Sequence, residues 1–217
     1  MLTLQWNLTI YRTGLKHNSM IINLGKTKEI IFYNSRAIPS LTPLPIFCIK
    51  QVSSAKLLSV YVQGNFSCDM HFKHIITVSS QRLHILKALR RQGLSLELLQ
   101  CVFHAIIVNK ITYAISAWYG FLYKSHVLQI STLFKRAFKY GYVKSVIKLN
   151  EELLQDYDDK LFTKATQGIH AMHHLLPSPK STCYNLRTLG HGLSVNCVKS
   201  KLHKNTFINR LVFEDCY

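Results

Sequence analysis

Residues 69–93, "DMHFKHIITVSSQRLHILKALRRQG", have the apolar spacing of a long amphipathic helix. Apolar residues recur three and four positions apart and fall on one face: Phe72, Ile75, Ile76, Leu83, Leu86 and Leu89. Gly93 stands where the helix should stop, because glycine readily adopts the left-handed backbone that ends many helices. We therefore predict one helix from Asp69 to just before Gly93.

Two further helices are expected downstream, which would complete a small bundle ending near Tyr142. Ser95 is a suitable N-cap for the first, and Glu97 lies in its first turn, where the helix dipole favours a negative charge. Ser125 is a suitable cap for the other, whose apolar side is lined by Val127, Ile130, Phe134 and Phe138.

The most apolar stretch is 102–118, "VFHAIIVNKITYAISAW". It contains His104, Asn109 and Lys110, which would be costly at the centre of a bilayer. We predict a buried amphipathic helix here and no membrane partner.

Short strands are expected before the bundle. Segments 18–23, "NSMIIN", and 28–33, "KEIIFY", are rich in Ile and separated by Gly25, which predicts a hairpin. Segment 57–63, "LLSVYVQ", predicts another strand ending at Gly64, and residues 2–16 predict a short helix.

Residues after the bundle begin with a helix and then break at Pro177 and Pro179. The predicted fold is therefore α+β. It has a short, incomplete antiparallel sheet within 1–67, a helical bundle over 68–148, and a C-terminal helix with an irregular tail over 149–217.

The net charge is strongly positive: 27 Lys and Arg against 10 Asp and Glu, or +17 over 217 residues. Such a field attracts nucleic acid or an acidic membrane surface, although a solvated basic surface explains the composition equally well. The six cysteines contain no Cys-x-x-Cys pair, and the N-terminus lacks the apolar core of a signal peptide. We expect free thiols and an intracellular location, either cytoplasmic or nuclear.

Positive charge is concentrated in the bundle, where His71 to Lys148 contains twelve Lys and Arg and one acid, Glu97. Lys135, Arg136 and Lys139 share a helix face near Tyr140. Basic and aromatic residues together suit contact with a nucleic-acid backbone. The candidate contacts in this region are Lys73, Arg82, Lys87, Arg90, Arg91, Lys135, Arg136 and Lys139.

The segment 154–162, "LQDYDDKLF", looks superficially like the paired aspartates of nucleic-acid polymerases. Those carboxylates share two cations at a tight turn between strands. Here apolar residues recur every four positions instead, at Leu149, Leu153, Tyr157, Leu161, Ala165 and Ile169. We predict a helix with Tyr157 inward, Asp158 and Asp159 exposed, and no metal site.

Two clusters have part of the ligand spacing of a zinc site: Cys68 with His71 and His74, and His170 with His173, His174 and Cys183. Neither has a complete four-ligand pattern, so we expect no metal and no cofactor. Gly-rich phosphate loops, serine elbows and His-Glu-x-x-His motifs are absent from the sequence, and no catalytic residue is predicted.

Taken in order, several blocks resemble the C-terminal part of the reverse transcriptase of a non-LTR (LINE-type) retrotransposon. The blocks are "NSMIINLGKTKEIIF" (18–32), "KLLSVYVQGNFSCDMHFKHI" (56–75), "QRLHILKALRRQGLSLELLQCVFHAIIVNKITYAISAWYGFL" (81–122), "DDKLFTKATQGIHAMHHLLP" (158–177), "YNLRTLGHGL" (184–193) and "NTFINRLVFEDCY" (205–217). The resemblance implies a palm remnant over 1–67 and a thumb-like bundle over 68–148.

The resemblance also implies roles. The family is an RNA-directed DNA polymerase whose metal-binding aspartates would precede this segment. Lys26 or Lys28 would lie near the phosphates of the incoming nucleotide, and 57–62 would grip the primer end, with Ser59 where the family usually has Gly. The thumb would contact the backbone of RNA or of an RNA–DNA duplex.

The expected function is therefore that of a truncated reverse transcriptase fragment, catalytically inactive alone, with non-specific affinity for a template–primer. Two alternatives stay open. In the first, the chain is a fragment of an intact RNA-directed DNA polymerase, cut short because the gene model is incomplete. In the second, it is a helical protein-interaction module with no nucleic-acid function.

Overall fold

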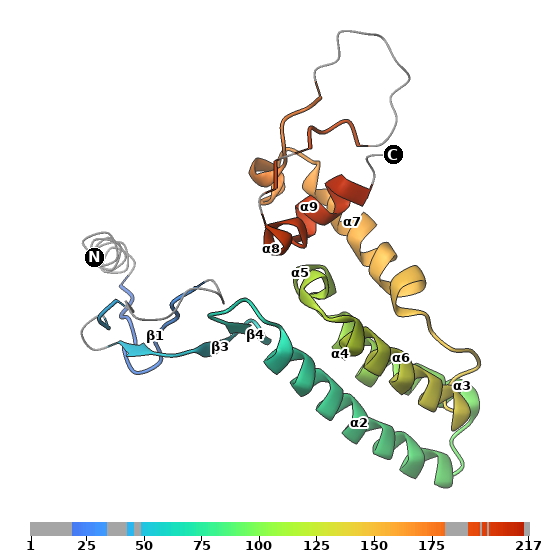
Figure 1. The fold of residues 1–217 in the computed structure, drawn as a ribbon. Helices are drawn as coiled ribbons and strands as arrows, with labels where there is room; N and C mark the ends of the chain where they lie inside the picture. Colours follow the sequence, from blue (N-terminus) through green and yellow to red (C-terminus); the bar gives the residue numbers. More distant parts are fainter. Residues whose placement is uncertain are drawn as a thin grey trace. The chain divides into compact units, whose positions relative to one another are not determined.

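The computed structural model describes residues 19–33, 43–45, 49–180, 191–195, 197–198 and 200–214. The fold is α+β, and the described residues are mainly helical with two small two-stranded sheets (Figure 1). It divides into two compact units, Met1–His71 and Phe72–Tyr217. The helix predicted at 2–16 lies outside the described residues.

The strands belong to the first unit. β1 (Lys28–Glu29) pairs in parallel with β2 (Lys50–Gln51), and β3 (Ser54–Leu57) pairs antiparallel with β4 (Val60–Gln63). The hairpin predicted between 18–23 and 28–33 is wrong, as is a purely antiparallel sheet. The side chain and carbonyl of Asn23 both accept from the amide of Lys26 at 3.1 Å, so the chain forms a local turn there.

The single strand predicted at 57–63 is also wrong, because β3 and β4 meet in a two-residue turn at Leu58 and Ser59. Their φ angles are 44° and 69°, positive as in the type I′ turns that suit the twist of a hairpin. The turn could not be predicted from the sequence, because Leu58-Ser59 lacks the Asn-Gly pattern that usually marks a two-residue hairpin turn.

Replacing Leu58 and Ser59 by Asn and Gly is expected to stabilise the hairpin by about 1–2 kcal/mol, since both residues tolerate positive φ. Amide hydrogen exchange within β4 should slow about 5- to 30-fold. Ser53→Gly, just before the hairpin, is the control and should not slow it. Unchanged exchange in the double variant would contradict the turn geometry.

The second unit contains the predicted bundle. α2 (Asp69–Arg91) ends as expected: Gly93 has φ 86°, its amide donates to Arg90 at 3.1 Å, and that of Leu94 donates to Leu89 at 3.2 Å. α3 (Leu96–Phe103) has its predicted N-cap, since the amide of Leu98 donates to Ser95 Oγ at 3.4 Å.

The same helical segment continues through the π-helical η1 (His104–Val108) into α4 (Asn109–Thr112). A break at Ala114, whose φ is 52°, separates it from α5 (Ile115–Trp118) and the short 3₁₀ helix η2 (Tyr119–Phe121). By length and composition alone, 96–121 could cross a membrane, and 39% of its most apolar window is buried within the protein.

α6 (Lys124–Lys139) closes the bundle. It begins before Ser125, so the predicted cap is wrong and Tyr123 occupies that position. Along the predicted face Ile130 and Phe134 are buried, whereas Phe138 is exposed. Phe103 of α3 meets Phe134 edge to face with ring centroids 6.1 Å apart, at the centre of the core.

α2 and α6 run in the same direction. Near their starts the rings of Phe72 and His126 stack with centroids 4.0 Å apart, and near their ends Arg90 donates to the carbonyl of Tyr140. The segment α3–η1–α4 contacts both helices: Arg82 of α2 donates to the carbonyl of Ile106 in η1, and Phe103 of α3 packs against Phe134 of α6. The C-terminal ends of α2 and α6 therefore lie at one end of the bundle.

The helix predicted around the Asp-Asp pair is confirmed, but its buried face is not. The π-helical η3 (Leu149–Leu154) precedes α7 (Gln155–Ala165), and i→i+5 bonding inserts one residue into the repeat. Leu149, Leu154, Asp158 and Ala165 are consequently buried. Tyr157 is exposed and Asp158 is buried, so both predictions for these side chains are wrong.

The tail is less irregular than predicted. After the 3₁₀ helix η4 (His173–Leu175), two further helices form, α8 (Lys201–Lys204) and α9 (Phe207–Glu214). Ser200 caps α8 by accepting from the amide of His203 at 3.2 Å. α9 folds because its apolar face is buried, at Phe207, Leu211 and Val212.

Candidate nucleic-acid interface

The ends of α2 and α6 are tied together by Arg90. Gly141 has φ 66° and ends α6 as Gly93 ends α2: the amide of Tyr142 donates to Ala137 at 3.0 Å. The guanidinium of Arg90 lies against Gly141 and donates to the carbonyl of Tyr140, where the helix dipole favours a cation.

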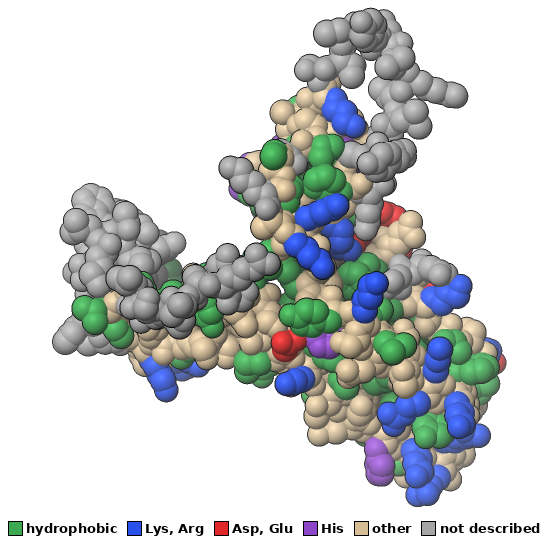
Figure 2. All heavy atoms as spheres, viewed as in Figure 1, with side chains coloured by type: hydrophobic (Ala, Val, Ile, Leu, Met, Phe, Trp, Pro, Cys, Tyr) green, Lys and Arg blue, Asp and Glu red, His purple; other side chains and the backbone are tan. Residues whose placement is uncertain are grey.

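Six of the predicted cations lie in the last two turns of α2 and α6. Arg90 and Arg91 occupy the last turn of α2, and Arg136 and Lys139 occupy that of α6. All six have exposed side chains, and we call them the basic bundle end: Lys87, Arg90, Arg91, Lys135, Arg136 and Lys139. Figure 2 shows Lys and Arg side chains gathered at the lower right, over the end of the bundle.

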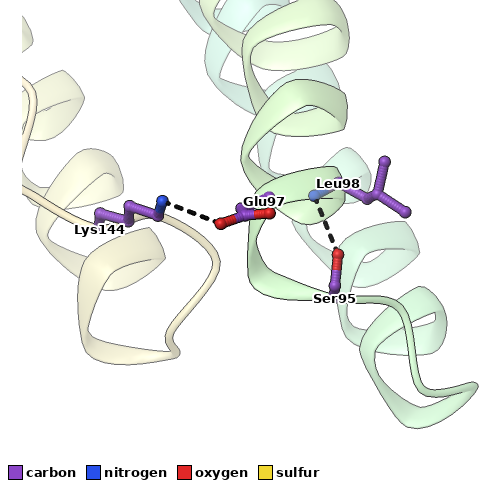
Figure 3. Close-up of polar contacts among 4 residues, drawn as sticks. All are labelled: Ser95, Glu97, Leu98 and Lys144. Atoms are coloured by element: carbon purple, nitrogen blue, oxygen red, sulfur yellow. Dashed lines mark hydrogen bonds and ion pairs between the residues drawn. The ribbon is translucent and has the colours of Figure 1, made fainter.

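The acid Glu97 and the aromatic residue Tyr140 lie close to this cluster. Lys144 Nζ lies 3.4 Å from Glu97 Oε1, an exposed pair worth only about 0–1 kcal/mol (Figure 3). Tyr140 is exposed, with its ring centroid 6.0 Å from that of the buried Tyr142. The surface can therefore offer several cations and exposed aromatic side chains, those of Tyr140 and of Phe138 in the last turn of α6, to a polyanion.

The other two bundle candidates lie elsewhere. Lys73 is exposed in the second turn of α2, eighteen residues before Arg91 and so about 27 Å away along the helix. Arg82 is half-buried and its guanidinium donates to the carbonyl of Ile106 inside the π-helical turn. Arg82 therefore connects two helices, and the structure does not bring Lys73 to the basic bundle end.

Lys26 and Lys28 belong to the first unit, where both are exposed. The amide of Lys26 is bound in the turn anchored by Asn23, while Lys28 is the first residue of β1. They lie near each other in the sequence, on either side of Thr27, whose hydroxyl donates to the carbonyl of Asn23 at 2.9 Å.

The aspartates of α7 are not arranged as a metal site. Asp158 Oδ2 forms an ion pair with Arg210 Nη1 of α9 at 2.7 Å, with side chains only 3% and 12% exposed. Asp159 is exposed, and Asp156 pairs with Lys160 at 2.7 Å one turn along the helix. Asp158 therefore joins two helices instead of facing a cleft.

In the first histidine and cysteine cluster, His71 and Cys68 have other surroundings, whereas Cys183 of the second cluster lies outside the described residues. Among the described residues, no three His, Cys, Asp or Glu side chains gather as metal ligands would. His71 Nδ1 accepts from the amide of Tyr61 at 3.4 Å. Burial, with a smaller contribution from the charge of Asp69, raises the pKa of Cys68 to about 11, so it is held as a thiol.

A cleft of about 610 Å³, not predicted from the sequence, lies where the α4–α5 junction faces α7. It is lined by Tyr113 and Ile115 on one side and by Tyr157, Lys160, Leu161 and Lys164 on the other. The i,i+4 spacing of the two lysines could have drawn attention to one wall. The opposite wall lies more than forty residues earlier in the sequence, and only folding brings it close.

Comparison with known proteins finds no match to this chain among family models, curated proteins or solved structures. The class of site is therefore defined by its own geometry: an exposed basic surface at the end of a helical bundle, with an aromatic side chain beside it.

Proposed function

We propose that this chain binds nucleic-acid backbones without sequence preference through the basic bundle end. We further propose that it does so as the C-terminal part of a non-LTR retrotransposon reverse transcriptase, with 1–67 as palm remnant and 68–148 as thumb. In this proposal the chain alone carries no polymerase activity and binds a template–primer of RNA or RNA–DNA.

One observation carries the binding proposal: two helices running in the same direction end together, each with exposed cations in its last turns. Cations at the ends of two helices also complement the helix dipoles, but that role would require fewer than these six charges. Exposed cations on rigid helices can displace the counterions of several phosphates at once, which favours binding at low salt. The order of the sequence blocks supports the assignment to the retrotransposon family.

The test is binding of a fluorescein-labelled RNA–DNA duplex to the whole chain over a salt series. Affinity should fall steeply between about 50 and 200 mM salt. The triple variant Arg91→Gln, Arg136→Gln, Lys139→Gln should bind about 10- to 100-fold more weakly at the lower salt. Its slope of log affinity against log salt should be shallower by about 2–3.

The matched control removes the same charge elsewhere in the second unit, at the exposed Lys180, Lys201 and Lys204. This control should keep most of the affinity and the slope. Absence of binding at low salt would refute the binding proposal and leave the interaction-module hypothesis. Equal losses in both variants would show that net charge, and not the basic bundle end, attracts the duplex.

The genomic DNA sequence distinguishes a reverse-transcriptase relic from part of a working polymerase. Translation of the genomic sequence upstream of Met1 in the same frame should encounter stop codons if the chain is a relic. An intact aspartate hairpin with flanking strands would instead make the chain part of a working enzyme.

A further inference from the structure

The cleft between the α4–α5 junction and α7 has the size and lining of a ligand site. Its volume of about 610 Å³ falls within the range of about 300–1,000 Å³ common for small-molecule sites. The buried Ile115 and the half-buried Leu161 line it, so part of its wall is apolar. None of the residues of the basic bundle end contributes to it.

Two tyrosines in the lining have exposed side chains. Tyr113 is 48% exposed and Tyr157 is 39% exposed, and they come from opposite sides of the cleft. The backbone of Tyr113 is held where α4 ends, because its carbonyl accepts from Trp118 Nε1 at 3.0 Å. Tyr157 is exposed because the π-helical η3 changes which face of α7 is buried.

Two lysines on α7 also line the cleft, one helical turn apart. Lys160 Nζ lies 2.7 Å from Asp156 Oδ2, and both side chains are exposed. Because exposed ion pairs are weak, a phosphate could displace Asp156 from Lys160. Among the residues that the structure describes, Lys164 forms no ion pair. The cleft thus offers aromatic faces and an apolar wall beside two cations.

We propose that this cleft binds an unpaired nucleotide of a single-stranded nucleic acid. The base would stack on Tyr113 or Tyr157, and Lys160 and Lys164 would contact the adjoining phosphates. Stacking on aromatic side chains beside a basic track is how proteins hold single strands without reading their sequence. An acidic peptide would pair with the lysines but offers no aromatic ring to stack on the exposed Tyr157 or to pack on the apolar wall, so a nucleotide fits this lining better.

The experiment uses the whole chain and a fluorescein-labelled ten-nucleotide single strand in three forms: unmodified, abasic at every position, and carrying one 2-aminopurine. We expect the abasic strand to bind about 5- to 150-fold more weakly, the range expected when base stacking is lost. The fluorescence of 2-aminopurine should be quenched on binding. The double variant Tyr113→Ala, Tyr157→Ala should abolish both the preference and the quenching.

Matched controls separate the site from general effects. Tyr123→Ala removes another exposed tyrosine and should change neither result. Lys164→Gln should weaken binding of all strands and reduce the salt slope by about one, whereas Lys124→Gln, at an exposed lysine outside the lining, should do so less. Circular dichroism of each variant checks that the helices persist.

The proposal is overturned if abasic and unmodified strands bind equally, if the tyrosine variant retains the quenching, or if poly-glutamate competes as well as the strand does. The proposed function is tested separately, by the affinity of the triple variant of Arg91, Arg136 and Lys139 for the duplex. That variant should keep the 2-aminopurine quenching even though it loses affinity for the duplex.

Discussion

Asp158→Ala should lower the free energy of unfolding by about 3–5 kcal/mol, because it leaves the guanidinium of Arg210 buried without its counter-ion. Arg210 is only 12% exposed and also lies over the ring of Tyr119, 5.5 Å from its centroid, so it cannot readily turn into water. Urea denaturation followed by circular dichroism measures the effect. Asp159→Ala, at the exposed neighbour, should change the stability by less than about 0.5 kcal/mol.

A double substitution tests whether the loss comes from the stranded charge. Asp158 Oδ1 and Arg210 Nε and Nη2 are buried without hydrogen-bond partners among the described residues, so the pair does not fully recover its desolvation cost. Asp158→Leu with Arg210→Met should therefore be within about 1 kcal/mol of the wild type, or more stable. A double variant as unstable as Asp158→Ala would contradict this account.

Gly120→Ala should destabilise the chain by about 3 kcal/mol, the upper part of the usual range for an overpacked site. A Cβ at Gly120, in η2, would overlap the backbone carbonyl oxygen of Asn205, which follows α8. Backbone cannot move aside as a flexible side chain can, so the contact between η2 and the C-terminal helices would have to open. The measurement is the urea midpoint, together with hydrogen exchange in α9.

Gly168→Ala is the matched control, because a Cβ there meets no atom within 4 Å and the φ of Gly168 is not positive. It should leave the stability unchanged or slightly increased. If Gly120→Ala were equally harmless, the packing of Asn205 against η2 would not contribute to the folded state.

The helical bundle could be predicted from sequence because its signals are local. The apolar face of α2, the glycine after it and the serine before α3 act through bonds to residues three to five positions away. The exposed cations of α6 follow from the same periodicity. The concentration of positive charge in the bundle could also be predicted, because it requires only a count of residues.

The errors have identifiable physical causes. The turn at Leu58 and Ser59 uses positive φ values that these residue types rarely adopt, so pairing of the strands overrides the local preference. In α7, the preceding π-helical turn shifts the repeat by one residue, which a strict period of four cannot anticipate. α8 and α9 were missed because short helices depend on packing for their stability.

The sequence by itself determined the long helices, the end of α2 at Gly93 and the cap of α3 at Ser95, since each depends on residues within a few positions of one another. The excess of positive charge follows from composition alone. Only the tertiary structure decided that α2 and α6 end together, that Asp158 meets Arg210, and that Tyr113 faces a cleft shared with Lys164. The residues that meet in each case, Arg90 with Tyr140, Asp158 with Arg210 and Tyr113 with Lys164, are 50 to 52 residues apart. Their meeting depends on how whole helices pack, and periodicity along one segment carries no information about that packing.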